Sequence, residues 1–451
     1  LSREARDLCV SYMPCCFGTR RHLEEWSEKP AEECPAEVTM ATRKAMREQA
    51  AHVVKDILRM WMQQHAGEQV PEEVFRLCEQ AVRSLNNGSF GPDSAAFVHW
   101  VHVELLRTEG PPQKHRSEDE WRALFPRYPS SSTDDGYLLC FEPSNVDGIR
   151  EALQKFGLCV VRVLTASQCE ETVIGMFEEV NALRAYYGVV GPPVDPHNAA
   201  TWQSENWPSK NRYLVKDRAL HKQAFANRCN GCIYEVFAAI FRERRLHVSV
   251  DNWGIARGAR DNPDWAVALR PHWDVSPWRF VEDVQQGLDP GYQGLVALTD
   301  QNLETGCHLT LPGCTHFMEQ WCAERRQDWV GANQSFKAAE DDPVVPYMQP
   351  VPLRRGEMVI WSCGQLHASI GSSSQDMRLV QYIRMYPAPE AGCKVNYEGR
   401  DPHGCVRALK RCFETGELTQ AAIDSFGLDA LGKRLLALES WDAEASTAVL
   451  A

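Results

Sequence analysis

The sequence predicts an α+β fold in which short strands form a β-barrel or sandwich and helices pack against it. Two observations support this prediction. Between residues 291 and 385, short apolar runs alternate with turns rich in glycine, proline and serine, a pattern typical of barrels and sandwiches. In the first part of the chain, apolar residues instead recur at the helical spacing of three and four. With 44% hydrophobic and 24% charged residues, the chain has the composition of a globular protein with a substantial core.

Residues 1–135 are expected to form an accessory helical region. The apolar positions predict amphipathic helices over residues 46–61, 74–85 and 93–106. These helices would form a small bundle or a lid on the barrel, and their apolar stripes are more typical of a core than of a partner surface. A proline- and serine-rich stretch at 129–136 predicts the linker to the next domain.

Residues 136–390 are expected to form the strand-rich domain. Its first strand is predicted at Phe156–Leu164, and Thr165–Glu170 has the capping-box pattern of a helix start. Residues 391–451 are expected to be a helical tail that covers the barrel. Further strands are predicted over residues 291–300, 306–316, 351–361 and 378–385.

One tripeptide of this domain, His272-Trp-Asp274, has the spacing of a metal-binding pair. Side chains alternate along a strand, so both ligands would point to one face while Trp273 packs on the other. With His367 as the leading candidate for the third ligand, two imidazoles and one carboxylate would form a non-haem Fe(II) centre with three open positions. The tripeptide alone is weak evidence, because chance matches are common. The same spacing occurs at His22-Leu-Glu24 and at His102-Val-Glu104.

The surroundings of the tripeptide are more specific. The relevant segments are His-Trp-Asp-x-x-Pro-Trp from His272, Tyr-Gln-Gly-Leu-Val-Ala-Leu from Tyr292, Leu-Pro-Gly-x-x-His from Leu311, Arg-Gly-Glu-Met-Val-Ile-Trp from Arg355, and then His367 and Arg378. Together with a matching opening strand and closing helix, they resemble the phytanoyl-CoA dioxygenase-like branch of the Fe(II)/2-oxoglutarate-dependent oxygenases. The resemblance spans residues 136–445.

This resemblance implies both a fold and a metal. The fold of the family is a double-stranded β-helix, a jelly-roll barrel with helices packed on one face. The resemblance also implies that His272, Asp274 and His367 hold Fe(II), and it makes residues 136–390 a dioxygenase domain.

The resemblance further implies a cosubstrate site. Arg378 would pair with the distal carboxylate of 2-oxoglutarate, a role that suits a planar guanidinium better than an ammonium group. Ser369, two residues after His367, would donate a hydroxyl hydrogen bond to the same carboxylate. Gln293 and Asn252 are expected on strands that line the cosubstrate pocket.

The implied activity is hydroxylation, or another oxidation, of an unactivated C–H bond in a small or medium organic substrate. It would consume O2 and 2-oxoglutarate and release succinate and CO2, with ascorbate as a supporting reductant. Two alternatives stay open at this point. One is a non-catalytic jelly-roll interaction protein, and the other is a cupin-like metal enzyme that does not use 2-oxoglutarate. Arg378 favours the oxygenase, since a plain metal-binding jelly roll has no need of a cation there.

Charge and hydropathy limit the partners. A net charge of −13 disfavours a nucleic-acid surface, which needs clustered lysine and arginine. No stretch has the apolar length of a membrane span. The sequence therefore favours a small-molecule substrate and does not identify a protein partner. Seven cations would either contact an anionic substrate or lie solvated at the surface: Lys210, Arg212, Lys216, Arg218, Arg257, Arg260 and Arg270.

The cysteines indicate the compartment. Seventeen scattered cysteines favour free thiols in a reducing environment over a disulfide framework. The lone Cys229-x-x-Cys232 pair is not expected to bind zinc. The first residues do not resemble a signal peptide, so we expect an intracellular and cytoplasmic protein. An organelle stays open, because the chain begins with Leu1 rather than with Met.

Overall fold

The computed structural model describes residues 116–133, 135–208, 219–289, 291–325, 335–339, 341–389 and 404–444. Most of them belong to one compact unit formed by Arg116–Glu319 and Asn333–Ala451. The helices predicted over 46–61, 74–85 and 93–106 lie outside the described residues, as do the four cations between 210 and 218. The predicted domain boundaries at 135 and 390 stay predictions.

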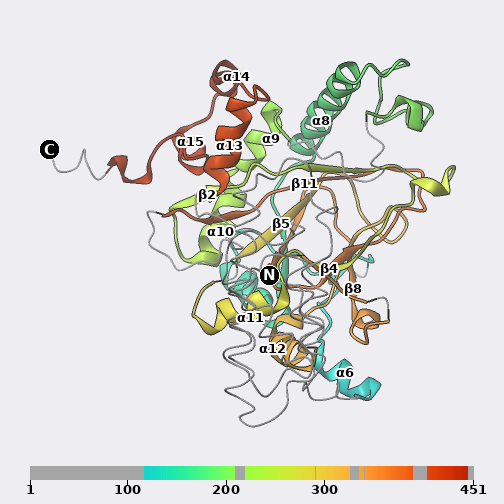
Figure 1. The fold of residues 1–451 in the computed structure, drawn as a ribbon, viewed down its shortest axis with the longest axis vertical. Coiled ribbons are helices and arrows are strands. Elements are labelled where there is room, and N and C mark those ends of the chain that lie inside the picture. Colours follow the sequence, from blue (N-terminus) through green and yellow to red (C-terminus); the bar gives the residue numbers. More distant parts are fainter. Residues whose placement is uncertain are drawn as a thin grey trace, which may run out of the picture. The chain divides into compact units, whose positions relative to one another are not determined.

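The fold is a mixed α/β arrangement built on antiparallel sheets, as the sequence predicts (Figure 1). The first five-stranded sheet has the order β1 (Leu158–Arg162), β9 (Glu357–Ser362), β5 (Tyr292–Ala297), β11 (Arg378–Tyr382) and β3 (Trp253–Ala256). The second has the order β7 (Phe336–Lys337), β4 (Leu269–Trp273), β10 (His367–Ser369), β6 (His308–Thr310) and β8 (Gln349–Val351). A two-stranded sheet pairs β12 (Met385–Pro387) with β2 (Leu246–Val248).

Strands β1, β5, β6 and β11 lie inside ranges that the sequence predicts, and β9 ends one residue beyond its range, at Ser362. Strands β2, β3, β7, β8 and β12 lie wholly or largely outside the predicted ranges. The run 306–316 forms only the short strand β6, and helix α12 (Cys314–Glu324) follows almost at once. The turn at Pro312-Gly313 explains this, because Gly313 has φ +76 and ends the extended backbone. Every residue of β9 is buried, as expected for a strand with neighbours on both edges and cover on both faces.

Ten α-helices lie in the described part of the chain. Besides α12 they are α6 (Glu118–Leu124), α7 (Val146–Phe156), α8 (Ala166–Tyr186), α9 (Lys222–Arg228), α10 (Gly231–Phe241), α11 (Pro277–Gln285), α13 (Gly404–Glu414), α14 (Gln420–Ser425) and α15 (Ala430–Leu435). Short 3-10 helices cover Ala199–Thr201, Ser204–Asn206, Pro263–Trp265, Val345–Tyr347 and Trp441–Glu444.

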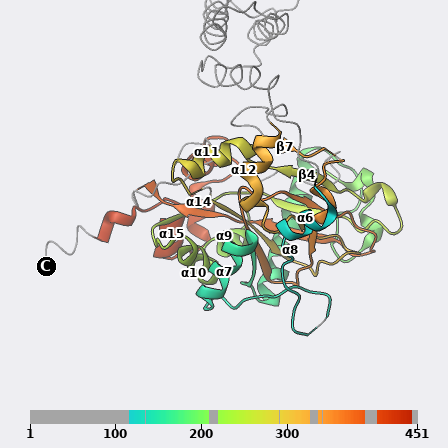
Figure 2. The ribbon, with the colours of Figure 1, turned by 90° about the horizontal axis from the view of Figure 1, so that it is seen from below.

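Helix starts follow the local sequence. The Thr165 side chain caps α8 by accepting a hydrogen bond from the backbone of Gln168, whose side chain in turn accepts one from the Thr165 backbone. The predicted capping box is thus present. Helices α7 and α10 lie next to each other in the view from below (Figure 2). Cys229 is the C-cap residue of α9, and Cys232 lies in the first turn of α10. Both cysteines are free thiols.

Buried polar contacts join the helices to the first sheet. The amide of Gln381 on β11 donates to the carbonyl of Ala224 on α9 (3.0 Å) and accepts from Asn227 (2.8 Å). Asn227 also donates to Thr172 of α8 (2.8 Å). Since side chains alternate along a strand, Gln381 faces the helices while Arg378 and Val380 face the opposite way. The face that carries Arg378 therefore points away from α8 and α9.

None of the helices in the described part of the chain combines the length and the apolar character that crossing a bilayer requires.

The backbone conformation of Gly356, in the turn before β9, leads to a testable prediction about stability. It has φ +87, and a Cβ there would collide with the backbone carbonyl of Leu164. Gly356→Ala should therefore lower the free energy of unfolding by about 2 kcal/mol or more, from backbone strain and the clash together. Urea denaturation followed by circular dichroism measures this.

Gly416→Ala is the matched control. Gly416 has φ +75, but nothing lies within 4 Å of the added Cβ, so this variant should show the strain alone, about 1 kcal/mol. Equal losses in the two variants would show that the close approach of the Leu164 carbonyl contributes nothing.

Candidate metal centre

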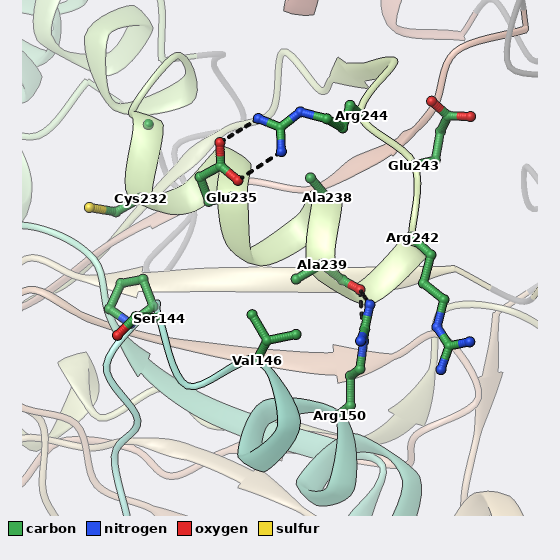
Figure 3. Close-up of a pocket in the computed structure, with 12 residues that line it drawn as sticks. Ser144, Val146, Arg150, Cys232, Glu235, Ala238, Ala239, Arg242, Glu243 and Arg244 are labelled. Atoms are coloured by element: carbon green, nitrogen blue, oxygen red, sulfur yellow. Dashed lines mark hydrogen bonds and ion pairs between the residues drawn. The ribbon is translucent and has the colours of Figure 1, made fainter.

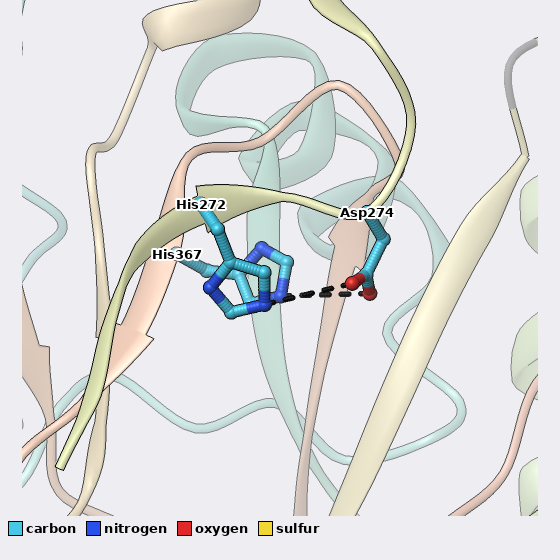
Figure 4. A group of neighbouring side chains, drawn as sticks. All are labelled: His272, Asp274 and His367. Carbon is cyan, nitrogen blue, oxygen red and sulfur yellow. Dashed lines mark ion pairs between the residues drawn. The ribbon is translucent and has the colours of Figure 1, made fainter. Parts of the chain in front are cut away.

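The two histidines of the proposed ligand set lie on neighbouring strands. Strand β10 pairs antiparallel with β4, and the register places His367 opposite His272. Residues directly opposite each other point to the same face of a sheet. The two imidazole rings accordingly lie 4.4 Å apart between centroids (Figure 4).

The carboxylate comes from the residue that follows β4. Its two oxygens face the two rings, with Asp274 Oδ1 3.5 Å from His272 Nε2 and Asp274 Oδ2 3.6 Å from His367 Nε2 (Figure 4). One ligand atom from each residue lies within 4.8 Å of the other two. Ligand atoms that share an ion at bond lengths of about 2.1 Å are roughly 3 to 3.5 Å apart. The spacing therefore suits a single metal ion.

Both imidazoles are oriented by backbone carbonyls. His272 Nδ1 lies 2.8 Å from the carbonyl oxygen of Arg270, and His367 Nδ1 lies 3.0 Å from that of Gln365. A carbonyl oxygen can only accept, so each Nδ1 carries the proton and each Nε2 keeps its lone pair for a metal. These hydrogen bonds fix the tautomer and the orientation of each ring, as a metal-binding imidazole requires.

The charges of the cluster also suit a cation. Burial alone would raise the pKa of Asp274, but the hydrogen bond with His272 and the electrostatic interaction with both imidazole rings hold it well below its usual value. Burial lowers the pKa of His367. Burial would likewise lower the pKa of His272, yet the contact with Asp274 raises it instead. At neutral pH the cluster thus has an ionised carboxylate next to a neutral His367.

Gln293 connects the cluster to the other sheet. It lies on β5 of the first sheet, and its Nε2 donates a 2.9 Å hydrogen bond to Asp274 Oδ2. The sequence assigns Gln293 to the cosubstrate pocket, whereas the structure places its amide on the carboxylate of the metal cluster. A donor at this oxygen fixes the carboxylate plane and supports its ionised form.

Ser369 lies on β10 together with His367, and Arg378 lies on β11 of the first sheet. Arg378 begins β11, is 2% exposed, and donates from Nε to Gln301 Oε1 at 2.9 Å. The Ser369 hydroxyl accepts from the backbone N–H of Leu269 at 3.0 Å, so its own proton can still be donated to a ligand. It also shares a strand face with His367 two residues earlier.

Asn252, which the sequence assigns to the cosubstrate pocket, lies well away from Arg378 along the sheet. Its backbone carbonyl accepts from the N–H of Tyr382, at the end of β11 opposite to Arg378. Arg378 pairs with Ala256, four residues further along the chain. At a rise of about 3.3 Å per residue, this separation is on the order of 13 Å.

Sequence reasoning missed His308 and Trp361. His308, on β6, is 3% exposed, and its ring lies 4.7 Å from that of Trp361 and 5.7 Å from that of His367. Burial, with the charges of His367 and Arg378, holds the pKa of His308 well below its usual value, so the ring is neutral. The available signal was the alternation in Cys-His-Leu-Thr, which puts His308 and Thr310 on one strand face.

A separate surface groove lies between the loop before α7 and helix α10 (Figure 3). Most of its charged residues pair with another charged side chain or with the backbone. Arg244 pairs with Glu235 at 2.7 Å, and Arg150 donates to the carbonyl of Ala239 at 2.6 Å. Nothing in this groove matches the convergence of ligand atoms at His272, Asp274 and His367. The cluster of these three side chains is therefore the better candidate site.

Two comparisons with known proteins point to the same family. The family model of phytanoyl-CoA dioxygenase matches residues 133–380. A Dictyostelium discoideum protein named after phytanoyl-CoA dioxygenase is 22% identical over 319 residues, which cover 64% of this chain and 86% of that protein.

Among solved structures, GlcNAc Inducible Gene 2 of Candida albicans is similar in fold. It is 13% identical with a TM-score of 0.50, covering 76% of this chain and 84% of its own. The epimerase SnoN, in complex with Fe3+, alpha ketoglutarate and nogalamycin RO, is 17% identical with a TM-score of 0.38, covering 55% and 85% respectively.

The ligand assignment predicts the metal affinity of variants. His367→Ala should weaken Fe(II) binding by more than about 100-fold, because it removes one of three ligands, and Gln293→Leu by about 10-fold, because it releases the Asp274 carboxylate. Anaerobic Fe(II) titration followed by calorimetry measures both. His316→Ala, an exposed histidine on α12, is the control and should bind like the unmodified chain. Unchanged affinity in His367→Ala would remove it from the ligand set.

Proposed function

The chain belongs to the phytanoyl-CoA dioxygenase family, and from this premise we propose that it is an Fe(II)- and 2-oxoglutarate-dependent dioxygenase acting on a small or medium organic molecule. The family model covers residues 133–380, which include all three proposed metal ligands and Arg378. The main support is the convergence of His272, Asp274 and His367, with their ligand atoms within 4.8 Å of one another.

We further propose that the two five-stranded sheets are the halves of a double-stranded β-helix. Two sets of contacts between them support this. Gln293 of the first sheet reaches Asp274, and Trp361 of the first sheet lies against His308 and His367 of the second. The metal cluster would then lie inside the barrel, between the sheets.

The donor set decides which metal fits. Two neutral imidazoles and one carboxylate suit Fe(II) with open positions, and they leave room for a bidentate cosubstrate and for O2. Iron and 2-oxoglutarate, when bound, would supply the oxidation of an unactivated C–H bond, with succinate and CO2 as co-products. The protein supplies orientation and a dry environment.

The residues of this chain have separate roles in that proposal. His272, Asp274 and His367 would hold the metal, and Gln293 would keep the carboxylate in place through its 2.9 Å hydrogen bond. The Arg378 guanidinium, fixed by Gln301, would bind the distal carboxylate of 2-oxoglutarate.

Ser369 and Asn252 have further proposed roles. Ser369 would donate its hydroxyl proton to the same carboxylate as Arg378. Asn252, at the other end of β11, would contribute to the pocket wall rather than to the carboxylate contact.

The structure changes the interpretation of one cation near the site. Arg257 is 2% exposed, and its guanidinium lies 4.3 Å from the ring centre of Trp265 and 5.0 Å from that of Trp207. It also donates to the carbonyl of Trp202 at 2.6 Å. Arg257 is therefore a packing residue of the adjoining loop, neither a solvated surface cation nor an evident substrate contact. An anionic substrate stays a prediction.

Turnover in the absence of substrate tests the proposal. Purified protein with Fe(II), ascorbate, O2 and 2-oxoglutarate should slowly release succinate, because this family of reactions can run uncoupled from the substrate. Succinate is measured by mass spectrometry. Failure to bind 2-oxoglutarate, together with no succinate, would favour a non-catalytic jelly roll. Activity that ignores 2-oxoglutarate would favour a cupin-like metal enzyme.

Arg378→Ala should raise the KM for 2-oxoglutarate by roughly 10- to 100-fold, the loss expected for a hydrogen bond to a charged group. The affinity for Fe(II) should stay within about 2-fold, since Arg378 is not a ligand. Arg378→Lys should recover only part of the loss, because an ammonium group lacks the planar fork. Arg122→Ala, an exposed arginine on α6, is the control. An unchanged KM in Arg378→Ala would place the cosubstrate elsewhere.

A further inference from the structure

His308 is a buried polar group without a visible partner. Its Nε2 atom is buried and has no hydrogen-bond partner, and the residue is 3% exposed. Leaving such a group unpaired costs roughly 1 to 3 kcal/mol, and native proteins rarely tolerate it without a reason. A ligand that completes the hydrogen bond is one such reason.

The position of His308 points to the ligand. On the paired strands β6 and β10, His308 lies directly opposite Ser369, and Thr310 opposite His367. These four side chains therefore share one sheet face. The His308 ring is stacked on that of His367 at 5.7 Å with an interplanar angle of 23°. Arg378 is close enough for its charge to act on His308. His308 thus lies among the groups proposed for the metal and for the distal carboxylate.

We propose that His308 is a further cosubstrate-binding residue, whose Nε2–H donates a hydrogen bond to the distal carboxylate of 2-oxoglutarate beside Arg378 and Ser369. The inference rests on the proposed function. It adds a third donor to that carboxylate, contributed by the strand next to β10.

The charge balance of the site fits a neutral donor. A divalent metal ion, the Asp274 carboxylate and the Arg378 guanidinium sum to two positive charges, and 2-oxoglutarate brings two negative charges. A neutral imidazole adds a hydrogen bond without disturbing that balance, whereas a second cation would leave an excess charge in a buried place. The Trp361 ring, whose centroid lies 4.7 Å from that of His308 at a tilt of 37°, holds the imidazole in position.

The test measures binding rather than turnover, with two 2-oxo acids that differ only at the distal end. 2-Oxoglutarate carries the distal carboxylate, and 2-oxopentanoate has a methyl group there. Each is titrated anaerobically into the Fe(II)-loaded protein, and binding is followed by the charge-transfer absorption of the ferrous 2-oxo acid complex. Fe(II) affinity is measured separately for every variant.

His308→Leu should weaken the binding of 2-oxoglutarate by roughly 10- to 100-fold. It should leave the affinity for 2-oxopentanoate within about 3-fold of that of the unmodified chain, and the affinity for Fe(II) unchanged. His308→Gln, which keeps a donor amide, should recover most of the affinity. His308→Phe, which keeps a ring against Trp361 without a donor, should behave like the Leu variant and serves if that one does not fold. His247→Leu is the matched control, because His247 on β2 is equally buried (3% exposed). This variant should not change the affinity for either 2-oxo acid.

Three results would overturn the inference. Equal weakening of both 2-oxo acids would show that His308 acts on the metal-chelating end or on the fold. Loss of Fe(II) binding in the His308 variants would make it a support of the metal centre. Full retention of 2-oxoglutarate affinity would show that the imidazole makes no contact with it. If the unmodified chain binds Fe(II) but no 2-oxoglutarate, the proposed function itself fails, an outcome visible before any variant is made.

Discussion

The register between β4 and β10 is the constraint on which the metal centre depends. A slip of one residue would turn His367 to the other face of the sheet and separate the two imidazoles. Hydrogen bonds around β10 hold it in place. On the β4 side the Ser369 hydroxyl accepts from the N–H of Leu269 at 3.0 Å. On the β6 side the Thr310 hydroxyl donates to the carbonyl of Leu366 at 2.9 Å, and the Gln365 amide donates to the carbonyl of Leu311. Hydrogen bonds beside His367 thus help to determine where the ligand atoms lie.

The opposite sheet completes the site. Gln293 fixes Asp274, which has no strand of its own because β4 ends at Trp273. Trp273 itself is buried on the other side, where its indole donates to the carbonyl of Gly364. The two proposed histidine ligands are therefore oriented by backbone carbonyls of their own strand segments, and Asp274 by a side chain from the other five-stranded sheet. A carboxylate held by two imidazoles and an amide keeps its charge, and so stays a ligand rather than a protonated acid.

Much of this arrangement could be predicted from the sequence, and the remainder was missed for a physical reason. Turn residues around apolar runs located β5, β9 and β11. The spacing of His272 and Asp274 predicted one strand face for both residues, but β4 ends at Trp273 and Asp274 directly follows it. Gln301 carries no local signal, and the alternation around His308 shows only which strand face it occupies. What matters for both is their proximity to residues on strands distant in the chain. Asn252 shows the same limit, since a strand position does not reveal which end of the pocket it reaches.

The loop after β3 shows why the family chemistry does not determine the substrate. Arg257 directly follows β3, the strand that pairs with the Arg378 strand, yet it lies between two indole rings. In a buried site a guanidinium stacked on Trp207 and Trp265 gains more from the ring faces and from the Trp202 carbonyl than from water. This contact packs the loop that follows β3. Strand pairing brings the proposed metal ligands together, whereas the loops that would shape a substrate pocket are packed independently of it.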